Sequence, residues 1–157
     1  MAADEQRGRG LGPTGETVRE RIKQLRGRVP VTELSARLEA LGRPIPPLGI
    51  RRIESGERRV DVDDLVALAV ALGVTPVSLL MPAAADRDER GEGTGTGEQR
   101  AERLWKWLVA DNPLSGSDRS IVEFWAASWP VWEHDNMARE VEERKRRASG
   151  GRRGDDK

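Results

Sequence analysis

The stretch that decides the fold spans residues 46–59 and reads PPLGIRRIESGERR. Two prolines open it, at positions where a helix does not need the backbone N–H. Gly56 favours the left-handed conformation that ends many helices. Ile50 and Ile53 lie three residues apart, so both face the same side of this short helix. The pattern predicts an apolar inner face and a basic outer face. The outward positions are Leu48, Arg51 and Arg52.

Apolar residues recur at helical spacing on both sides of this segment, from about Thr17 to Met81. The spacing predicts five short helices. Thr32 is the expected N-cap of the second helix, Asp61 of the fourth and Thr75 of the fifth. No segment alternates convincingly with a period of two, so we expect no sheet. The predicted fold class is therefore all-α.

The run IRRIESG at 50–56, followed by VDDLVALA at 62–69 and ALGV at 71–74, closely resembles the helix-turn-helix family of the Cro/lambda-repressor type, often called XRE-like. The resemblance covers about residues 16–82. It implies a five-helix repressor-type domain that binds a specific sequence of duplex DNA, usually as a dimer. It also implies a role in transcription, usually repression.

Two features depart from the family pattern. Leu34 and Ile50 are separated by 50 − 34 = 16 positions, which is more than family members usually have. We therefore expect a longer second helix and a longer turn, with the extra residues around 39–44. The start of the recognition helix, residues 46–49, carries Pro-Pro-Leu-Gly where the family often has Gln, Ser or Thr.

The outer arginines suit DNA chemically. An arginine can bind guanine O6 and N7 with two hydrogen bonds, which discriminates by ~1–3 kcal/mol, and Leu48 could touch a thymine methyl group. Arg52 is either a base reader or a structural ion-pair partner. Glu54 is expected to bind an arginine of the first helix, such as Arg19 or Arg21.

Positive charge gathers locally in a chain that has no net charge overall. Residues 43–59 hold five arginines against two glutamates, a surplus of three positive charges. Loop arginines beside a recognition helix are placed to contact phosphates. The predicted DNA-binding residues are Arg43, Pro47, Leu48, Arg51, Arg52, Arg58 and Arg59.

The composition divides the chain into five parts. We expect a disordered N-terminus at 1–14, the helix-turn-helix domain at 15–82 and a flexible, Gly-rich linker at 83–98. A helical module should follow at 99–147, and a disordered tail at 148–157.

The module at 99–147 contains all five tryptophans. Their helical spacing indicates a core rather than a base-stacking platform. About fifty residues rarely bury enough surface alone, and a second copy would supply the missing burial. We therefore predict a dimerisation module; a protein partner or a small inducer remains the alternative. The predicted interface residues are Leu104, Trp105, Leu108, Trp125, Trp129 and Trp132.

The chain has no Cys and a single His, His134. This excludes thiol catalysis, disulfides and Cys-based zinc sites. We expect no enzymatic activity, no metal and no cofactor. No apolar run approaches the ~18 residues of a membrane span, and the first residues lack the apolar stretch of a signal peptide. A cytoplasmic, nucleoid-associated protein is expected.

The sequence predicts a DNA-binding transcriptional regulator, a repressor of the phage or mobile-element type that binds an operator as a dimer. The alternative is an antitoxin or adaptor with the same fold, whose Trp-rich module binds a partner protein.

Overall fold

The computed structural model describes residues 10–114 and 120–150. The chain divides into two compact units, Met1–Leu108 and Val109–Lys157. Disorder is predicted for 1–14 and 148–157; residues 1–9 and 151–157 of these ends lie outside the described residues, whereas Pro13 and Thr14 belong to the first helix, so the prediction is wrong there. Each unit is described by itself below.

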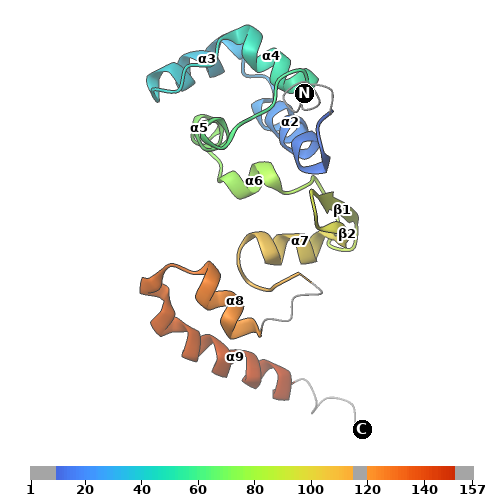
Figure 1. The fold of residues 1–157 in the computed structure, drawn as a ribbon, viewed down its shortest axis with the longest axis vertical. Coiled ribbons are helices and arrows are strands. Elements are labelled where there is room, and N and C mark those ends of the chain that lie inside the picture. The colour runs from blue at the N-terminus through green and yellow to red at the C-terminus, as the bar shows by residue number, and fades with distance from the viewer. Residues whose placement is uncertain (1–9, 115–119, 151–157) are drawn as a thin grey trace, which may run out of the picture. The chain divides into compact units, whose positions relative to one another are not determined.

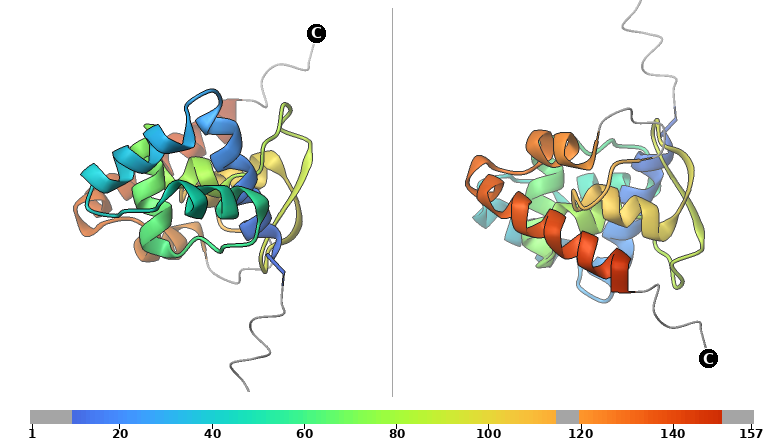
Figure 2. Two further views of the ribbon diagram at one scale, coloured as in Figure 1. Left: turned by 90° about the horizontal axis from the view of Figure 1, so that it is seen from above. Right: turned by 90° about the horizontal axis from the view of Figure 1, so that it is seen from below.

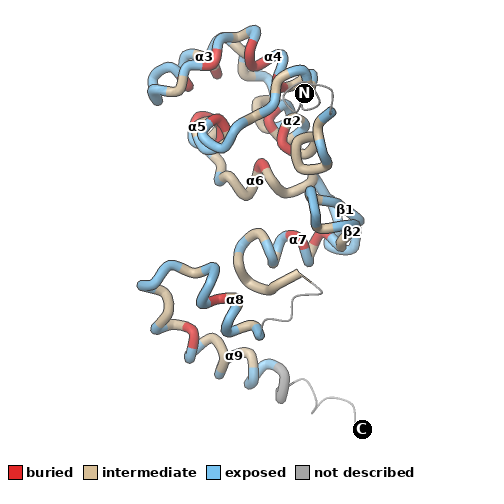
Figure 3. Tube along the Cα trace, viewed as in Figure 1, coloured by how far each residue is buried: buried red, intermediate tan, exposed pale blue. Residues whose placement is uncertain are grey.

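The first unit contains the five helices that the apolar spacing predicts (Figure 1). When this unit is seen from above, α3 and α4 lie across α2 and α5 (Figure 2, left). One apolar core joins all five helices, and Figure 3 marks its buried positions. The helices are α2 (Pro13–Arg26), α3 (Val31–Ala40), α4 (Pro47–Ser55), α5 (Val62–Leu72) and α6 (Pro76–Leu80). The fully buried core side chains include Ile22, Leu34, Leu38, Ile50, Ile53, Leu68 and Leu79.

Local signals at the helix ends account for most of these boundaries. The Asp61 carboxylate accepts the Asp64 N–H at 2.7 Å, and Thr75 Oγ1 accepts the Ser78 N–H at 3.3 Å, so both predicted N-caps are confirmed. Gly56 ends α4 with φ 84° in the left-handed region. The prediction for Thr32 is wrong, because α3 begins at Val31 directly after a proline.

The turn between α3 and α4 is long, as expected, and runs through residues 41–46. Gly42 turns the chain with φ 77°, and the Arg43 N–H returns to the Leu38 carbonyl at 3.0 Å. Ile45 is 1% exposed, and its carbonyl accepts the Ser35 hydroxyl at 2.7 Å. The turn is therefore anchored to α3 at its far end, just before α4 begins.

A β-hairpin occupies much of the predicted linker, so the expectation of no sheet is wrong. Strands β1 (Arg90–Gly93) and β2 (Gly97–Arg100) pair antiparallel, with Gly93 opposite Gly97. Gly95 and Gly97 both have positive φ, which the tight turn requires. The two strands consist of glycine, charged residues and a glutamine, so they lack the alternating apolar pattern by which strands are recognised in a sequence. They pair through backbone hydrogen bonds.

The hairpin continues directly into α7 (Ala101–Leu108), which lies in the helical module predicted at 99–147. The Thr94 N–H donates to Thr14 Oγ1 of α2 at 2.8 Å, and Leu104 of α7 is 2% exposed. The boundary between units therefore falls after Leu108 and not in the predicted linker 83–98.

The second unit is built from α8 (Ile121–Ser128), the 3₁₀ helix η1 (Val131–Asn136) and α9 (Met137–Gly150). Trp125 is fully buried and stacks on Trp129, with ring centroids 4.9 Å apart. The Arg144 guanidinium lies 4.7 Å from the Trp125 ring centroid, a cation–π contact. α9 runs past the predicted module end at 147 into the predicted tail.

Among the described helices, none has both the length and the apolar character that crossing a membrane requires.

Candidate nucleic-acid interface

Helix α4 presents two opposite faces. Ile50 and Ile53 are fully buried, as their spacing predicts. Leu48 is 58% exposed, and Arg51 and Arg52 are exposed on the outer side. Arg52 Nε lies 4.0 Å from the Glu57 carboxylate, which is a loose surface pair. The outer face of α4 is therefore basic, with one exposed apolar side chain near its N-terminal end.

The first turn of α4 is closely covered by neighbouring side chains. Pro47 occupies the first helical position, where it is partly buried. A Cβ atom on Gly49 would come within 2.9 Å of Arg58 Nη1 and 3.0 Å of Ile45 Cγ2. Glycine at this position therefore lets Arg58 and Ile45 approach the helix backbone.

Two of the predicted phosphate contacts, Arg43 and Arg58, bind a buried carboxylate in the structure. Asp64 is 1% exposed, and its two oxygens accept Arg43 Nε and Arg58 Nη2, each at 2.8 Å. Arg43 also donates to Asp61 at 2.7 Å. A buried carboxylate needs such partners, because an unpaired charge in the interior is costly. These two arginines thus join the turn before α4 and the loop after it to the start of α5.

The same cluster shifts the pKa values of its exposed members. The hydrogen bond to Asp64 is the main cause that raises the pKa of Arg43, and the neighbouring acid charges add to it. The pKa of Asp61 is lowered, chiefly because its carboxylate accepts the Asp64 N–H and also because Arg43 lies close. Both shifts favour the charged forms, as expected for paired groups.

Glu54, at the end of α4, is held by the first helix through Arg26. Arg26 donates through Nε and Nη2 to the two carboxylate oxygens at 2.6 and 2.9 Å. This hydrogen bond is the main cause that raises the pKa of Arg26. Glu54 was expected to bind an arginine of the first helix, and this is confirmed, but the arginine is Arg26 and not Arg19 or Arg21. Arg19 reaches only the Glu54 backbone carbonyl, and Arg21 donates to the Ser78 carbonyl.

Two further arginines flank α4. Arg59 is exposed in the loop after it, and its Nη2 donates to the Gly10 carbonyl at 3.2 Å. Arg28 is exposed in the connection between α2 and α3. Arg26 holds this connection near the end of α4, because its guanidinium donates both to the Val29 carbonyl and to the Glu54 carboxylate. Sequence analysis missed Arg28, because only the tertiary pairing brings this connection close to the end of α4.

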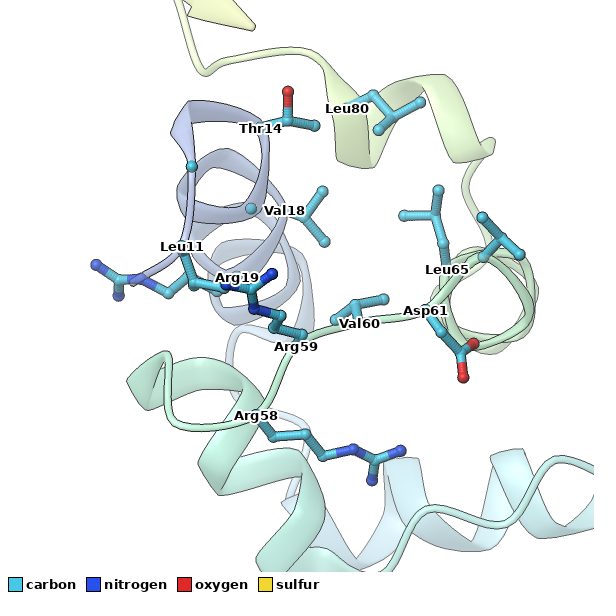
Figure 4. A pocket seen from close by; sticks show the side chains of 13 residues that line it. Leu11, Thr14, Val18, Arg19, Arg58, Arg59, Val60, Asp61, Leu65 and Leu80 are labelled. Atoms are coloured by element: carbon cyan, nitrogen blue, oxygen red, sulfur yellow. The ribbon is translucent and has the colours of Figure 1, made fainter. Parts of the chain in front are cut away.

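An apolar cavity of about 270 Å³ lies beside the loop that follows α4. Figure 4 shows Val18, Val60, Leu65 and Leu80 around it, contributed by α2, the loop, α5 and α6. Arg58 and Arg59 come from the same loop. The hollow is partly open to solvent, and Arg19 and Asp61 also line it.

The six predicted dimerisation residues do not form one module. Leu104, Trp105 and Leu108 belong to the first unit, and Trp125, Trp129 and Trp132 to the second. Leu104 and Trp125 are buried within their own units, whereas Trp105 is 48% and Trp132 is 79% exposed. Dimerisation through the exposed members stays a prediction.

No group of three or more metal-ligating side chains occurs among the described residues. His134 Nε2 lies 3.2 Å from the Trp129 carbonyl, so the single histidine contacts the backbone of its own unit.

Comparison with protein families identifies a helix-turn-helix segment in the first unit. Residues 31–79 match the family model described as Helix-turn-helix. The match runs from the start of α3 into α6 and includes the whole of α4. The comparisons with curated proteins and with solved structures gave no match.

The fold and the family match together define a DNA-binding domain of the kind found in transcription regulators. Residues 31–79 are a helix-turn-helix domain of the Cro/lambda-repressor type, in which α3 and α4 are the two helices of the motif.

Proposed function

We propose that this protein binds a specific duplex DNA sequence through the outer face of α4 and represses transcription there. The observation that carries the proposal is the division of α4, with Ile50 and Ile53 fully buried and Arg51 and Arg52 exposed on the opposite side. A helix of this size fits the major groove, where base edges are distinguishable.

Within this proposal the residues have different tasks. No ion pair or hydrogen bond engages Arg51 within the described residues, so its guanidinium can bind a guanine edge. Arg52 can do the same after leaving its loose pair with Glu57. Leu48 supplies apolar contact for a thymine methyl group. Arg59 and Arg28, at the two sides of α4, contact phosphates and hold the register.

Selection from a pool of random duplexes with the full chain tests the proposal. We expect an enriched consensus sequence that contains guanine. Arg51→Ala should weaken binding to it by about 1–3 kcal/mol and relax the preference at one position. Arg103→Ala, which changes an exposed arginine of α7, is the matched control and should bind as the parent does. A pool that returns no preferred sequence refutes the proposal.

The phosphate contacts can be tested separately from base reading, through the dependence of DNA affinity on salt. Affinity should fall steeply with salt, because each neutralised phosphate releases counterions. Arg59→Ala should weaken binding to all sequences alike and reduce the slope of log affinity against log salt by about one. An unchanged slope would remove Arg59 from the interface but leave base reading by α4 intact.

A second candidate function rests on the second unit. Val131 is 78% exposed and Trp132 is 79% exposed, and both lie in η1. Neighbouring apolar side chains this exposed are typical of a surface that binds another protein. An antitoxin or adaptor would bind its partner there. Two results together would favour this candidate. DNA binding would be weak and nonspecific, and a protein that co-purifies tightly with the chain would no longer bind after Trp132→Ala.

A further inference from the structure

The segment that follows α7 is bound by two tryptophans of the second unit. Trp129 Nε1 donates to the Ala110 carbonyl at 2.9 Å, and Trp125 Nε1 donates to the next carbonyl, that of Asp111, at 3.0 Å. The two rings are stacked on each other. The stacked pair thus supplies two N–H donors to two consecutive peptide units of this segment.

Arg144 of α9 binds the same segment. Its Nη2 donates to the Asp111 carbonyl at 3.2 Å and to the Asp111 carboxylate, and its Nη1 donates to Asn112 Oδ1 at 2.9 Å. Glu140, one helical turn earlier, accepts Arg144 Nε at 3.2 Å and so helps to orient the guanidinium. The three side chains that bind residues 110–112 are called the tryptophan clasp below: Trp125, Trp129 and Arg144.

Ala110 has a backbone conformation that alanine rarely adopts. Its φ is 56°, and among the described residues it is the one residue other than glycine with a positive φ. The Cβ atom makes this left-handed conformation unfavourable, whereas alanine favours the ordinary α-helix more than any other residue. The local sequence therefore favours continuing α7 beyond Leu108, and the bonds to the tryptophan clasp stabilise a turn there instead.

We infer that the tryptophan clasp determines where α7 ends. With the clasp closed, the helix ends at Leu108 and Ala110 is left-handed. When the clasp opens, residues 109–111 join α7. The helix then stops before Pro113, because the residue that precedes a proline disfavours helical backbone. Three added residues lengthen α7 by about 4.5 Å.

Through the chain itself, the clasp makes a helix of the first unit depend on the state of the second. α7 contacts both strands of the hairpin, and β1 contacts α2. A molecule that binds the second unit and competes for Trp129 or Arg144 would lengthen α7, whereas one that leaves both in place would not. The inference goes beyond DNA binding and does not depend on it.

NMR spectroscopy of the full chain tests the inference at Ala110. In the parent we expect the strong NOE between the amide proton and Hα of one residue that a positive φ produces. Trp129→Phe keeps an aromatic ring but lacks the indole N–H. In this variant the Ala110 NOE should weaken, and the NOEs between residues three apart that mark a helix should extend to Asp111. Arg144→Gln should act in the same way, because it removes the guanidinium from Asp111.

Two further variants control the test. Arg147→Gln is the matched control for Arg144→Gln, since Arg147 lies in the same helix but its side chain is 74% exposed and pairs within α9. It should leave the end of α7 unchanged. Ala110→Gly acts in the opposite direction, because glycine adopts positive φ without steric cost and forms helices poorly. Added to Trp129→Phe, it should restore the turn after Leu108.

A helix that still ends at Leu108 in both Trp129→Phe and Arg144→Gln would overturn the inference. So would a second unit that unfolds, shown by fast hydrogen exchange in α8 and α9, without any lengthening of α7, because unfolding also opens the clasp. Lengthening in Arg147→Gln would overturn it as well, since the effect would then not come from the clasp.

Discussion

Arg26 and Glu54 lie 28 residues apart in the chain, yet they form a doubly hydrogen-bonded ion pair at the C-terminal end of α4. Their side chains are only 16% and 10% exposed. The same guanidinium donates to the Val29 carbonyl at 2.7 Å. One arginine therefore joins the first helix, the connection to α3 and the C-terminal end of α4.

Glu54→Gln should destabilise the first unit, because it leaves the Arg26 guanidinium without its counter-charge. The expected loss is about 2–3 kcal/mol, below the value for a fully buried pair. Urea unfolding measures it. Glu57→Gln alters a glutamate that is 69% exposed and only loosely paired, so it should change the unfolding free energy by less than about 0.5 kcal/mol. Equal effects of the two variants would contradict a structural role for Glu54.

Asp64→Asn should also destabilise the unit, by about 2–3 kcal/mol, since two arginines lose the charge that holds them. DNA binding should weaken together with stability, because Arg43 and Arg58 secure the loops on both sides of α4. The neighbouring variant Asp63→Asn is the control and should unfold like the parent, given that its side chain is 77% exposed. A fully stable Asp64→Asn protein would show that the cluster does not support the fold.

Asp61 should make stability depend on pH. Its pKa is lowered in the folded protein, mainly by the N–H of Asp64. Its charge therefore stabilises the fold fully above the ordinary aspartate pKa of about 3.9, and this contribution is lost as the pH falls through the lowered value.

Asp61→Asn keeps a capping oxygen but has no charge to titrate. Its melting temperature should lie below that of the parent at pH 6, and the gap should close as the pH falls below about 4. Asp61→Ala removes the cap as well and should melt lower than Asp61→Asn throughout. A gap between the parent and Asp61→Asn that does not change with pH would contradict this assignment.

Trp125→Ala should unfold the second unit, because the buried ring contacts both Trp129 and Arg144. The expected cost is about 3–5 kcal/mol. Hydrogen–deuterium exchange followed by mass spectrometry should show faster exchange in α8 and α9 and unchanged exchange in α2 to α5. Trp132→Ala, at a ring that is 79% exposed, should leave both patterns unaltered. Faster exchange throughout the first unit would mean that the two units do not unfold separately.

Val60→Ile should stabilise the first unit by adding one methylene group to the cavity beside the loop. The gain should stay below the ~0.8 kcal/mol of a fully buried methylene group, because the hollow is partly open to solvent. Thermal unfolding measures it, and Val131→Ile at an exposed site should have no effect. A lower melting temperature for Val60→Ile would show that the loop cannot accommodate a larger side chain.

Much of the fold could be predicted because its signals are local. The three-residue spacing of Ile50 and Ile53 determines the inner face of α4, whatever packs against it. Asp61 and Thr75 cap their helices through hydrogen bonds to residues only three positions away. Gly56 ends a helix by its own conformational freedom. Such features depend on neighbours in the chain, so they can be recognised before any tertiary contact is known.

The hairpin and the unit boundary could not be found in this way. The strands at 90–93 and 97–100 pair through backbone groups, and their glycines carry no side-chain pattern. α7 shares helical spacing with the tryptophans that follow, but it packs with the hairpin in the first unit. Which neighbour a short helix joins depends on surfaces distant in sequence, and composition does not encode that choice.

By itself, the sequence determined the five helices of the first unit, the buried face of α4 and the resemblance to a repressor-type helix-turn-helix domain. Only the tertiary structure decided which arginines are engaged inside the protein. Arg26 binds Glu54, and Arg43 and Arg58 bind Asp64, although the residues of each pair are 6 to 28 positions apart. The physical reason is that an ion pair depends on the distance between two side chains in space. The sequence offers several arginines for each carboxylate, and only the packing of the helices decides which of them lies close enough to bind.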